Sequence, residues 1–306
     1  MTEQTDHGQT RCGFIALIGA PNAGKSTLLN ALVGGKVSIV SHKVQTTRAL
    51  VRGITIEGDA QLIFVDTPGI FRPKRRLDRA MVTSAWGGAG DADAVCLLID
   101  ARKGLDEESE AILAKLPEVR RTKMLILNKI DLVPRPALLE LAQSINAKLA
   151  FDETFMIAAI NGDGVASLRK RLAGFTKPGP WLYPEDQMSD APMRQLAAEI
   201  TREKLFERLH DELPYASTVE TDQWQVQKDG SVRIEQTIFV ERDSQRKIVL
   251  GHEGQTIKAI GSRARAEISD IAETKVHLFL FVKVRENWAD DPARYREMGL
   301  EFPRGG

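Results

Sequence analysis

The chain contains 306 residues, of which 42% are hydrophobic and 27% charged, and its 42 basic residues equal its 42 acidic residues in number. This length is enough for about two domains. The composition excludes a disordered chain, a fibrous protein and a small disulfide-stapled scaffold. Because the net charge is zero, any binding to nucleic acid must depend on a local basic surface.

The first half of the chain alternates short apolar runs with amphipathic stretches. Runs that are apolar throughout, separated by helical crossovers, are typical of a parallel sheet covered by helices on both faces. Residues 50–57 instead alternate between apolar and polar residues and lead through Gly58 and Asp59 into the next run, which predicts a hairpin with one antiparallel edge strand. We therefore expect a doubly wound α/β domain whose other strands contain residues 14–18, 62–65, 94–99, 124–127 and 155–158.

The second half begins after a change of composition, with three prolines between Pro178 and Pro184. Such a stretch predicts a linker. Beyond it, helical patterns cover residues 193–213 and 251–271, and strand-like runs cover residues 217–226, 231–240 and 276–284. With a second helix before residue 251, the order is α-β-β-α-α-β. We predict a first domain over residues 1–177, a linker over 178–190, and an α+β domain over 191–306.

A phosphate-binding loop follows the first apolar run. The sequence Gly19-Ala20-Pro21-Asn22-Ala23-Gly24-Lys25-Ser26 matches the pattern Gly-x-x-x-x-Gly-Lys-Ser/Thr and opens onto a helix. Backbone N–H groups of such a loop surround phosphate oxygens, the lysine reaches the β and γ phosphates, and the hydroxyl of Ser26 ligates Mg²⁺. We expect nucleotide contacts from Asn22, Ala23, Gly24, Lys25, Ser26 and Thr27.

Two further motifs stand at the ends of predicted strands. In Asp66-Thr67-Pro68-Gly69, the carboxylate can hold Mg²⁺ and the N–H of Gly69 can meet a γ-phosphate. In Asn128-Lys129-Ile130-Asp131, the Asp131 carboxylate can accept both the N1–H and the 2-amino group of guanine, a pair that adenine lacks. Asn128 would face the N7 edge of the base, and the stem of Lys129 would lie along the ring. These motifs predict a GTP site.

A second candidate site is the turn Gly251-His252-Glu253-Gly254, which lies between two predicted helices and resembles the KH signature. In a KH domain this turn clamps about four nucleotides of a single strand. Between residues 242 and 265, six basic residues exceed two acidic ones, so the basic surface is local. His252 and Glu253 stand where lysine is usual. We expect RNA contacts from Gly251, His252, Glu253, Gly254 and Lys258.

From Phe14 to about Asp291, the motifs and their order resemble the bacterial Era family of GTPases. Residues 36–41 and Gln45-Thr46-Thr47-Arg48 are similar to the first switch of that family. The resemblance implies that Thr47 gives Mg²⁺ a second hydroxyl beside Ser26 and Asp66, with Thr46 as the alternative. It also implies catalytic roles for Lys25, Thr47 and Gly69. A loop at Ala158 and Ala159 would contact the base through backbone N–H, although the family has Ser-Ala there.

Hydrolysis is less clearly specified by the sequence. Ras-type GTPases use a glutamine after Asp-x-x-Gly to orient the attacking water. Ile70 stands at that position here, and an aliphatic side chain cannot orient water. Related GTPases with asparagine at the position of Asn22 hold a potassium ion beside the phosphates. Two interpretations of Asn22 are open: it binds K⁺, or it only shapes the turn.

The resemblance implies a Mg²⁺-dependent enzyme that binds GTP and GDP, binds the 3′ end of small-subunit ribosomal RNA, and assists assembly and maturation of the small ribosomal subunit. The alternatives are a membrane-recruited GTPase switch and a GTPase of another RNA-processing step. The polar residues 1–8 do not resemble a secretion signal, and no apolar run reaches the roughly 18 residues of a membrane span. We expect a cytoplasmic monomer, with peripheral association with the inner membrane implied by the family.

Overall fold

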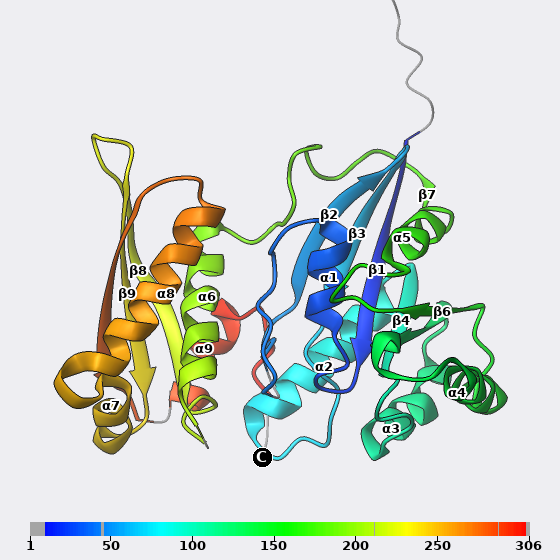
Figure 1. Cartoon of the computed structure of the whole chain (residues 1–306), viewed down its shortest axis with the longest axis horizontal. Coiled ribbons are helices and arrows are strands. Elements are labelled where there is room, and N and C mark those ends of the chain that lie inside the picture. The colour runs from blue at the N-terminus through cyan, green and yellow to red at the C-terminus, as the bar shows by residue number, and fades with distance from the viewer. Residues whose placement is uncertain (1–9, 44–45, 211, 287, 304–306) are drawn as a thin grey trace, which may run out of the picture. The chain divides into compact units, whose positions relative to one another are not determined.

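The computed structural model describes residues 10–43, 46–210, 212–286 and 288–303. The chain divides into two compact units, one formed by residues 1–38 and 47–190 and the other by residues 39–46 and 191–306 (Figure 1). Residues 1–8, on which the expectation of no secretion signal rests, lie outside the described residues.

The first unit contains a seven-stranded sheet with the order β2-β3-β1-β4-β5-β6, and a short strand β7 pairs with β1. The pairs that join β3, β1, β4, β5 and β6 are parallel, whereas β2 runs antiparallel to β3 at the edge. This confirms the prediction of a mostly parallel sheet with one antiparallel edge strand. The two-residue β7, also antiparallel, was not predicted. The strands are β1 (Arg11–Gly19), β2 (Val51–Glu57), β3 (Ala60–Asp66), β4 (Ala94–Asp100), β5 (Thr122–Asn128), β6 (Glu153–Ile157) and β7 (Lys177–Pro178).

Helices cover both faces of this sheet because its central strands are apolar on both sides. In β1, Ile15 and Leu17 pack against α1 (Lys25–Val33) and α5 (Val165–Ala173). The alternate residues Ala16 and Ile18 pack against the other layer (Figure 1). That layer consists of α2 (Arg76–Asp91), α3 (Glu107–Lys115) and α4 (Arg135–Lys148). The fold is doubly wound, and the carboxyl ends of its parallel strands carry the nucleotide motifs.

The proline-rich segment after residue 178 follows the edge of the first unit. The side chain of Gln61 on β3 accepts hydrogen bonds from the backbone N–H groups of Leu182 and Tyr183, at 2.8 and 3.1 Å. The N–H of Ile54 on β2 donates to the carbonyl of Met188 at 2.8 Å. These bonds satisfy edge groups of β2 and a buried side chain of β3, so the segment is held along the sheet up to about residue 190.

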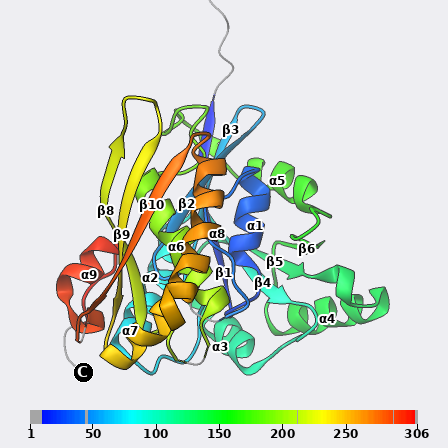
Figure 2. The same cartoon turned by 60° about the vertical axis from the view of Figure 1, so that its left-hand side comes forward.

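The second unit consists of a three-stranded sheet and helices in the predicted order. The sheet order is β10-β9-β8, with β10 parallel and β8 antiparallel to β9. Helices α6 and α8 pack on one face, and α9 lies beside the other face (Figure 2). Helix α6 ends at Arg208, five residues before the predicted end, and α9 was not predicted. The elements are α6 (Met193–Arg208), β8 (Ser217–Val226), β9 (Val232–Val240), α7 (Asp243–Leu250), α8 (Gln255–Ile271), β10 (Val276–Val284) and α9 (Pro292–Glu297).

Residues 39–46 come from the chain between α1 and β2, yet they belong to the second unit. The Ile39 side chain is 2% exposed and lies in an apolar core with residues of α6, α8 and β9. The N–H of Val40 donates to the Glu203 carboxylate at 2.7 Å, and the Lys43 ammonium donates to the carbonyls of Phe206 and Leu209 at the end of α6. A cation at a helix C-terminus satisfies carbonyls that have no partner within the helix. The sequence pattern did not indicate this placement.

Candidate nucleotide and RNA sites

The phosphate-binding loop joins β1 to α1, as the sequence predicts. Gly24 adopts a φ of 100° immediately before the first residue of α1, and Asn22 is also left-handed, at a φ of 63°. A Cβ atom on Gly24 would lie 2.2 Å from Nδ2 of Asn128. Glycine is therefore required at residue 24 both for the backbone conformation and for the close approach of the asparagine from β5.

The side chain of Lys25 is buried within this loop. Its Nζ donates to the carbonyls of Gly19 at 3.1 Å and Ala20 at 3.0 Å. Burial lowers the pKa of Lys25 to about 8, although the nearby Asp66 carboxylate works in the opposite direction. The loop thus holds a cationic group at the N-terminus of α1, where two backbone carbonyls fix its position.

Three hydroxyl groups converge on one oxygen of Asp66. Oδ2 accepts from Ser26 at 2.6 Å, from Ser38 at 3.0 Å and from Thr47 at 3.3 Å, while the Ser26 and Thr47 hydroxyls lie 2.9 Å apart. Burial raises the pKa of Asp66, opposed by Lys25 and these hydrogen bonds. Thr46, the alternative to Thr47, turns away and donates to the carbonyl of Lys43. Gln45 lies outside the described residues.

The other carboxylate oxygen tests whether a metal ion fits here. Asp66 Oδ1 is buried and has no hydrogen-bond partner in the part of the chain that the structure describes. A bare buried carboxylate oxygen is costly unless a cation or donor meets it. Oxygen donors of this kind are those that Mg²⁺ prefers. Ser26, Thr47 and Asp66 therefore fit a magnesium site, and Ser38 adds a third hydroxyl that sequence reasoning missed.

Residues 67–70 pack closely against the phosphate-binding loop. The Thr67 hydroxyl donates to the carbonyl of Leu17 at 2.8 Å, and the N–H of Ile70 donates to the carbonyl of Gly19 at 3.1 Å. A Cβ on Gly69 would lie 3.0 Å from Pro21, so the glycine allows this close approach. Ile70 is 6% exposed and lies in the apolar core. Its side chain is retracted from the site, as its aliphatic character leads us to expect.

The predicted base-recognition residues come together through the Asn128 side chain. Its Nδ2 donates to the carbonyl of Ala23 at 2.9 Å, and its Oδ1 accepts from the N–H of Ala159 at 3.0 Å. The expectation was that the Ala159 N–H faces the base. In this structure that N–H is engaged by Asn128 instead. Asp131 is exposed in a short helical turn at residues 130–132, and Ala158 is buried.

Asp100 at the end of β4 is a site residue that sequence reasoning missed. Its Oδ2 accepts from Lys129 Nζ at 2.6 Å, and the same ammonium donates to the carbonyl of Asn22 at 2.7 Å. Arg102 also donates to both oxygens of Asp100. The lysine therefore joins the base-recognition motif to the phosphate-binding loop. The position of Asp100 at the carboxyl end of an apolar strand is the feature of the sequence that could have identified it as a site residue.

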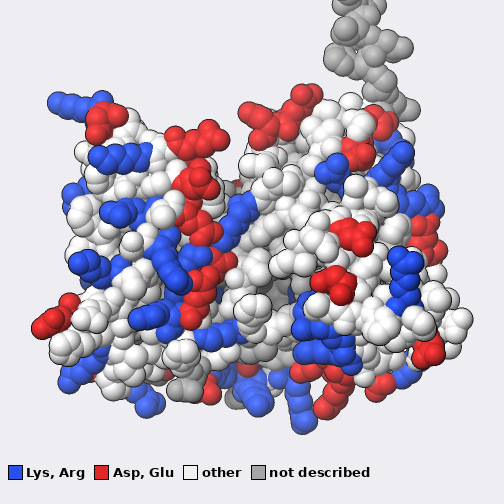
Figure 3. All heavy atoms as spheres, in the orientation of Figure 1, with Lys and Arg blue, Asp and Glu red and all other residues white. Residues whose placement is uncertain are grey.

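The predicted RNA turn has an unusual backbone. Gly251 has a φ of 72° and Gly254 a φ of 75°, and Glu253 between them is also left-handed, at a φ of 50°. A Cβ on Gly251 would lie 2.2 Å from Oγ1 of Thr256. His252, Glu253 and Lys258 are exposed, and Figure 3 shows Lys and Arg gathered over α7 and α8, next to a row of acidic side chains. The turn presents backbone and side chains to solvent at the start of α8.

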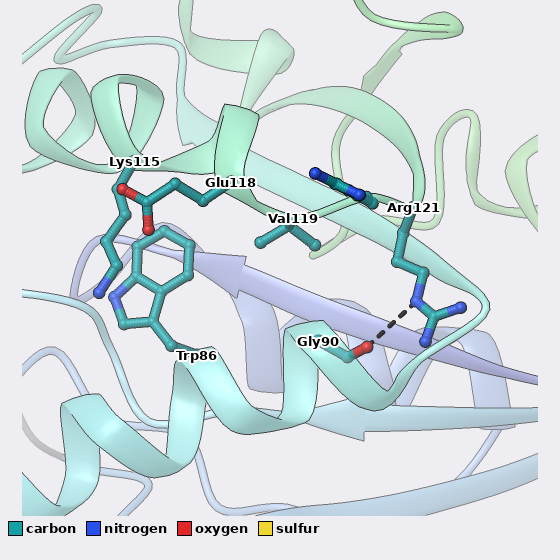
Figure 4. A pocket seen from close by; sticks show the side chains of 7 residues that line it. Trp86, Gly90, Lys115, Glu118, Val119 and Arg121 are labelled. Carbon is teal, nitrogen blue, oxygen red and sulfur yellow. Dashed lines mark hydrogen bonds between the residues drawn. The ribbon is translucent and has the colours of Figure 1, made fainter.

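A hollow of about 550 Å³ in the first unit lies apart from all these residues. Figure 4 shows Trp86 and Gly90 of α2 on one side and Lys115, Glu118, Val119 and Arg121 on the other. The Lys115 ammonium lies 4.9 Å from the centre of the Trp86 ring, and Arg121 donates to the carbonyl of Gly90 at 3.0 Å. None of the residues predicted to bind nucleotide or RNA lines this hollow.

Two negative findings concern the described residues alone. None of the helices described is long and apolar enough to cross a membrane. Nor does any group of three or more His, Cys, Asp or Glu side chains within the described ranges form a cluster that could hold a metal ion. The magnesium site above would therefore depend on hydroxyls together with one carboxylate.

Comparison with known proteins matches both units. The family model described as 50S ribosome-binding GTPase matches residues 14–129, and the KH domain model matches residues 212–289. GTPase Era of Bradyrhizobium sp. strain ORS 278 is 70% identical over 302 residues, which are 99% of this chain and 98% of that protein. GTPase Era of Brucella suis is 69% identical over 300 residues, covering 98% of this chain and 96% of its own length.

Two solved structures are similar over nearly the whole chain, each with a TM-score of 0.90, 36% identity and coverage of 95% of this chain and 99% of the other. One is a variant of Aquifex aeolicus Era bound to GDP and AlF4⁻. The other is Era in complex with MgGDPNP and nucleotides 1506–1542 of 16S ribosomal RNA.

Proposed function

The chain belongs to the GTPase Era family and is a GTP-hydrolysing enzyme, and we propose that it binds the 3′ end of small-subunit ribosomal RNA and assists assembly and maturation of the small ribosomal subunit. The main support for this proposal is the presence in one chain of a GTPase domain and a KH domain. A homologue with the same two parts has been solved with MgGDPNP and a 16S ribosomal RNA fragment.

We propose that Mg²⁺ is held by Ser26, Thr47 and Asp66. The metal ion would neutralise charge on the β and γ phosphates. Lys25, fixed by the carbonyls of Gly19 and Ala20, supplies a positive charge at the same place. The N–H of Gly69 is the donor that we assign to the γ-phosphate. Since Ile70 is buried in the core, no side chain at that position orients water, and the hydrolysis step relies on the backbone, Lys25, Mg²⁺ or a partner.

Base selection is assigned to Asp131, whose exposed carboxylate can accept two donors of guanine. Asn128 and Lys129 support it, because one side chain bonds to Ala23 and the other to Asn22. Ala158 and Ala159 are proposed to complete the base site. In that arrangement, the N–H of Ala159 would leave Oδ1 of Asn128 and donate to the base. The remaining loop residues Ala23, Gly24 and Thr27, with Thr67 and Pro68, are proposed to line the nucleotide.

For Asn22, the potassium proposal and the turn-shaping interpretation both stay open. Its left-handed φ of 63° suits a residue that shapes a turn, and its carbonyl accepts from Lys129. A carbonyl or amide oxygen beside the phosphates is also the kind of ligand that a hard monovalent cation takes. Comparing GTP turnover in potassium and sodium salts decides between the two.

The RNA site is assigned to Gly251, His252, Glu253, Gly254 and Lys258 in the second domain. Glycine at both ends lets phosphates approach the backbone N–H groups at the start of α8. We retain the division into residues 1–177, a segment 178–190 and residues 191–306 as our proposal for the domains. GTP would favour one arrangement of the domains and hydrolysis would release it.

Two alternative functions are a membrane-recruited GTPase switch and a GTPase of another RNA-processing step. The KH domain favours an RNA partner over a membrane partner. We place the protein in the cytoplasm as a monomer, with peripheral association with the inner membrane as the family resemblance implies.

The test is RNA binding by a variant of the turn in the full chain. Replacing both His252 and Glu253 with Asp adds negative charge where phosphates approach. It should weaken binding of a 3′-end ribosomal RNA fragment about tenfold at low salt, with a smaller salt slope. Affinity for GTP should not change, which serves as the internal control. Wild-type RNA affinity and salt slope in the variant would reject the turn as the RNA site, and GTP turnover stimulated by anionic vesicles rather than by the RNA would favour the membrane switch.

A further inference from the structure

The sheet of the second unit has one face that the helices α6 and α8 do not cover. Along β10, Leu278, Leu280 and Val282 pack toward those helices. Because side chains alternate along a strand, the residues between them point to the opposite face. There, Phe279 is 40% exposed and Phe281 46% exposed. We call this surface the open sheet face and define it by His277, Phe279, Phe281 and Lys283 of β10 with Arg233 and Glu235 of β9.

The strand register places these residues in neighbouring rows. His277 lies opposite Arg233, Phe279 opposite Glu235, and Lys283 opposite Phe239. The Arg233 guanidinium stacks 4.3 Å from the centre of the Phe279 ring and is held by Glu235 at 2.6 Å. A flat cation therefore already lies against one ring of this face.

Only part of the face is covered. Phe239 is flanked by the guanidinium groups of Arg285 and Arg294, at 5.9 and 5.4 Å from its ring centre, and Arg294 also pairs with Glu220. Helix α9 lies beside the end of the sheet where β10 finishes, and among the described helices of this unit none lies over this face where β10 begins (Figure 2). At the open end is a hollow of about 520 Å³ whose lining includes Gln227, Ser231, Arg233 and Phe279.

The charges of the open sheet face suit an anionic ligand. The acidic residue of the face and one that lines the adjoining hollow are both engaged within the unit. Glu235 binds Arg233, and Asp229 accepts from the Ser231 hydroxyl at 2.6 Å. Lys228 and Lys283 are exposed and form no ion pair among the described residues. Exposed rings flanked by cations are the combination that stacks unpaired bases while holding phosphates.

The face is also continuous with the proposed RNA turn. Arg246 of α7 donates to the carbonyl of Val282 on β10 at 3.3 Å, so the helix that leads into Gly251 lies beside this strand. β10 is the edge strand of the sheet. The helix that leads into the turn therefore lies beside the same edge strand that carries Phe279 and Phe281. Phe279 and Phe281 are two residues apart, about 7 Å along the strand, which suits neighbouring splayed bases.

We propose that the open sheet face is a second contact surface for single-stranded RNA, on which Phe279 and Phe281 each stack one unpaired base next to the nucleotides clamped by the turn. The inference rests on the proposed RNA-binding function and extends it. It assigns this chain a longer single-stranded footprint than the roughly four nucleotides that a turn of this type clamps.

The experiment measures binding of two fluorescein-labelled single-stranded RNAs, of about five and about twelve nucleotides, both with the sequence of the 3′ end of small-subunit ribosomal RNA. The full chain is used as wild type, as Phe279→Ala, as Phe281→Ala and as the double variant. Each substitution should lower affinity for the longer RNA at least about fivefold and leave affinity for the shorter RNA unchanged. Phe281→Trp should retain wild-type affinity, whereas Phe281→Leu, which is apolar but cannot stack, should lose it.

Two controls keep the inference separate from the function on which it rests. Val226→Ala removes an exposed apolar side chain at the end of β8 and should change neither affinity. The double Asp variant of the turn should weaken both RNAs. If the turn variant weakens both RNAs and the double Phe variant binds the longer RNA like wild type, the stacking surface is rejected while RNA binding stands. If wild type binds neither RNA, the proposed function itself fails.

A fluorescence measurement tests the stacking directly. The longer RNA carries 2-aminopurine at the base expected to stack on Phe279 or Phe281, and its fluorescence should fall on binding to wild type but not on binding to the double Phe variant.

Discussion

Replacing Asp100 with asparagine tests whether the ion pair between Asp100 and Lys129 stabilises the first unit. Burial by itself would raise the pKa of Asp100, but hydrogen bonds from Arg102 and Lys129 lower it from 3.8 to about 2. A carboxyl group whose pKa is lower in the folded than in the unfolded chain stabilises the fold above its ordinary pKa. That contribution is lost as the pH falls toward 2.

The size of the effect follows from the shift in pKa. A decrease of slightly less than two units in the pKa of Asp100 corresponds to about 2.5 kcal/mol of unfolding free energy at neutral pH. The Arg102 side chain is 47% exposed, so water screens its share of the interaction. We therefore expect Asp100→Asn to lower the unfolding free energy by about 1 to 2 kcal/mol, or the melting temperature by about 3 to 6 °C for a unit of this size.

The assay is urea unfolding of wild type and variant across a pH series. The difference in unfolding free energy should be constant from about pH 7.5 to pH 5 and should shrink between about pH 4 and pH 2.5. Asp91→Asn, at the exposed end of α2, is the matched control and should show no difference. GTP affinity should also fall, because Lys129 would lose the Asp100 carboxylate and keep neutral oxygen acceptors, such as the carbonyl of Asn22. A deficit that is absent at neutral pH, or that stays unchanged down to pH 3, would contradict the reasoning.

Three further predictions concern the nucleotide site. Asp131→Asn should shift preference from GTP toward xanthosine triphosphate, whose 2-oxo group accepts from the amide; an unchanged ratio of the two affinities would show that another residue reads the base. GTP turnover should rise when potassium replaces sodium at constant ionic strength, and Asn22→Ala should abolish the difference; equal wild-type rates in the two salts would leave only the turn-shaping role. Gly24→Ala should reduce affinity for a fluorescent GDP analogue by more than about tenfold, since its Cβ would meet Asn128 at 2.2 Å. Gly34→Ala, at a similar left-handed φ but with nothing within 4 Å, is the control and should bind the analogue normally.

The sequence predicts the arrangement of the sheet well because each central strand is a short apolar run at a fixed place between helices. The strand at residues 94–99 extends only one residue further, to Asp100, and residues 217–226 and 276–284 are strands with the predicted bounds. Local patterns also predict the phosphate-binding loop and the turn at Gly251, since both depend on glycine at defined positions.

Contacts between segments distant in sequence could not be predicted in this way. Nothing local in Asp100 indicates that it pairs with Lys129, because the two residues meet only when β4 and β5 lie side by side. In the same way, the proline-rich composition after residue 178 predicts an extended chain but not its hydrogen bonds to Gln61 and Ile54. Helix α9 is only six residues long, too short for a helical period to be recognised.

The assignment of residues 39–46 to the second unit limits where chimeras of two family members can be joined. Ile39 is a core residue of the second unit although its neighbour Ser38 contacts Asp66 in the first. A chimera that joins the first 190 residues of one homologue to the remainder of another would therefore put a foreign apolar residue into the α6 and α8 core and a foreign lysine against the end of α6. Ile39, Val40 and Lys43 must therefore come from the same homologue as the helices that they contact, because a crossover at the interdomain segment separates two pieces of one core.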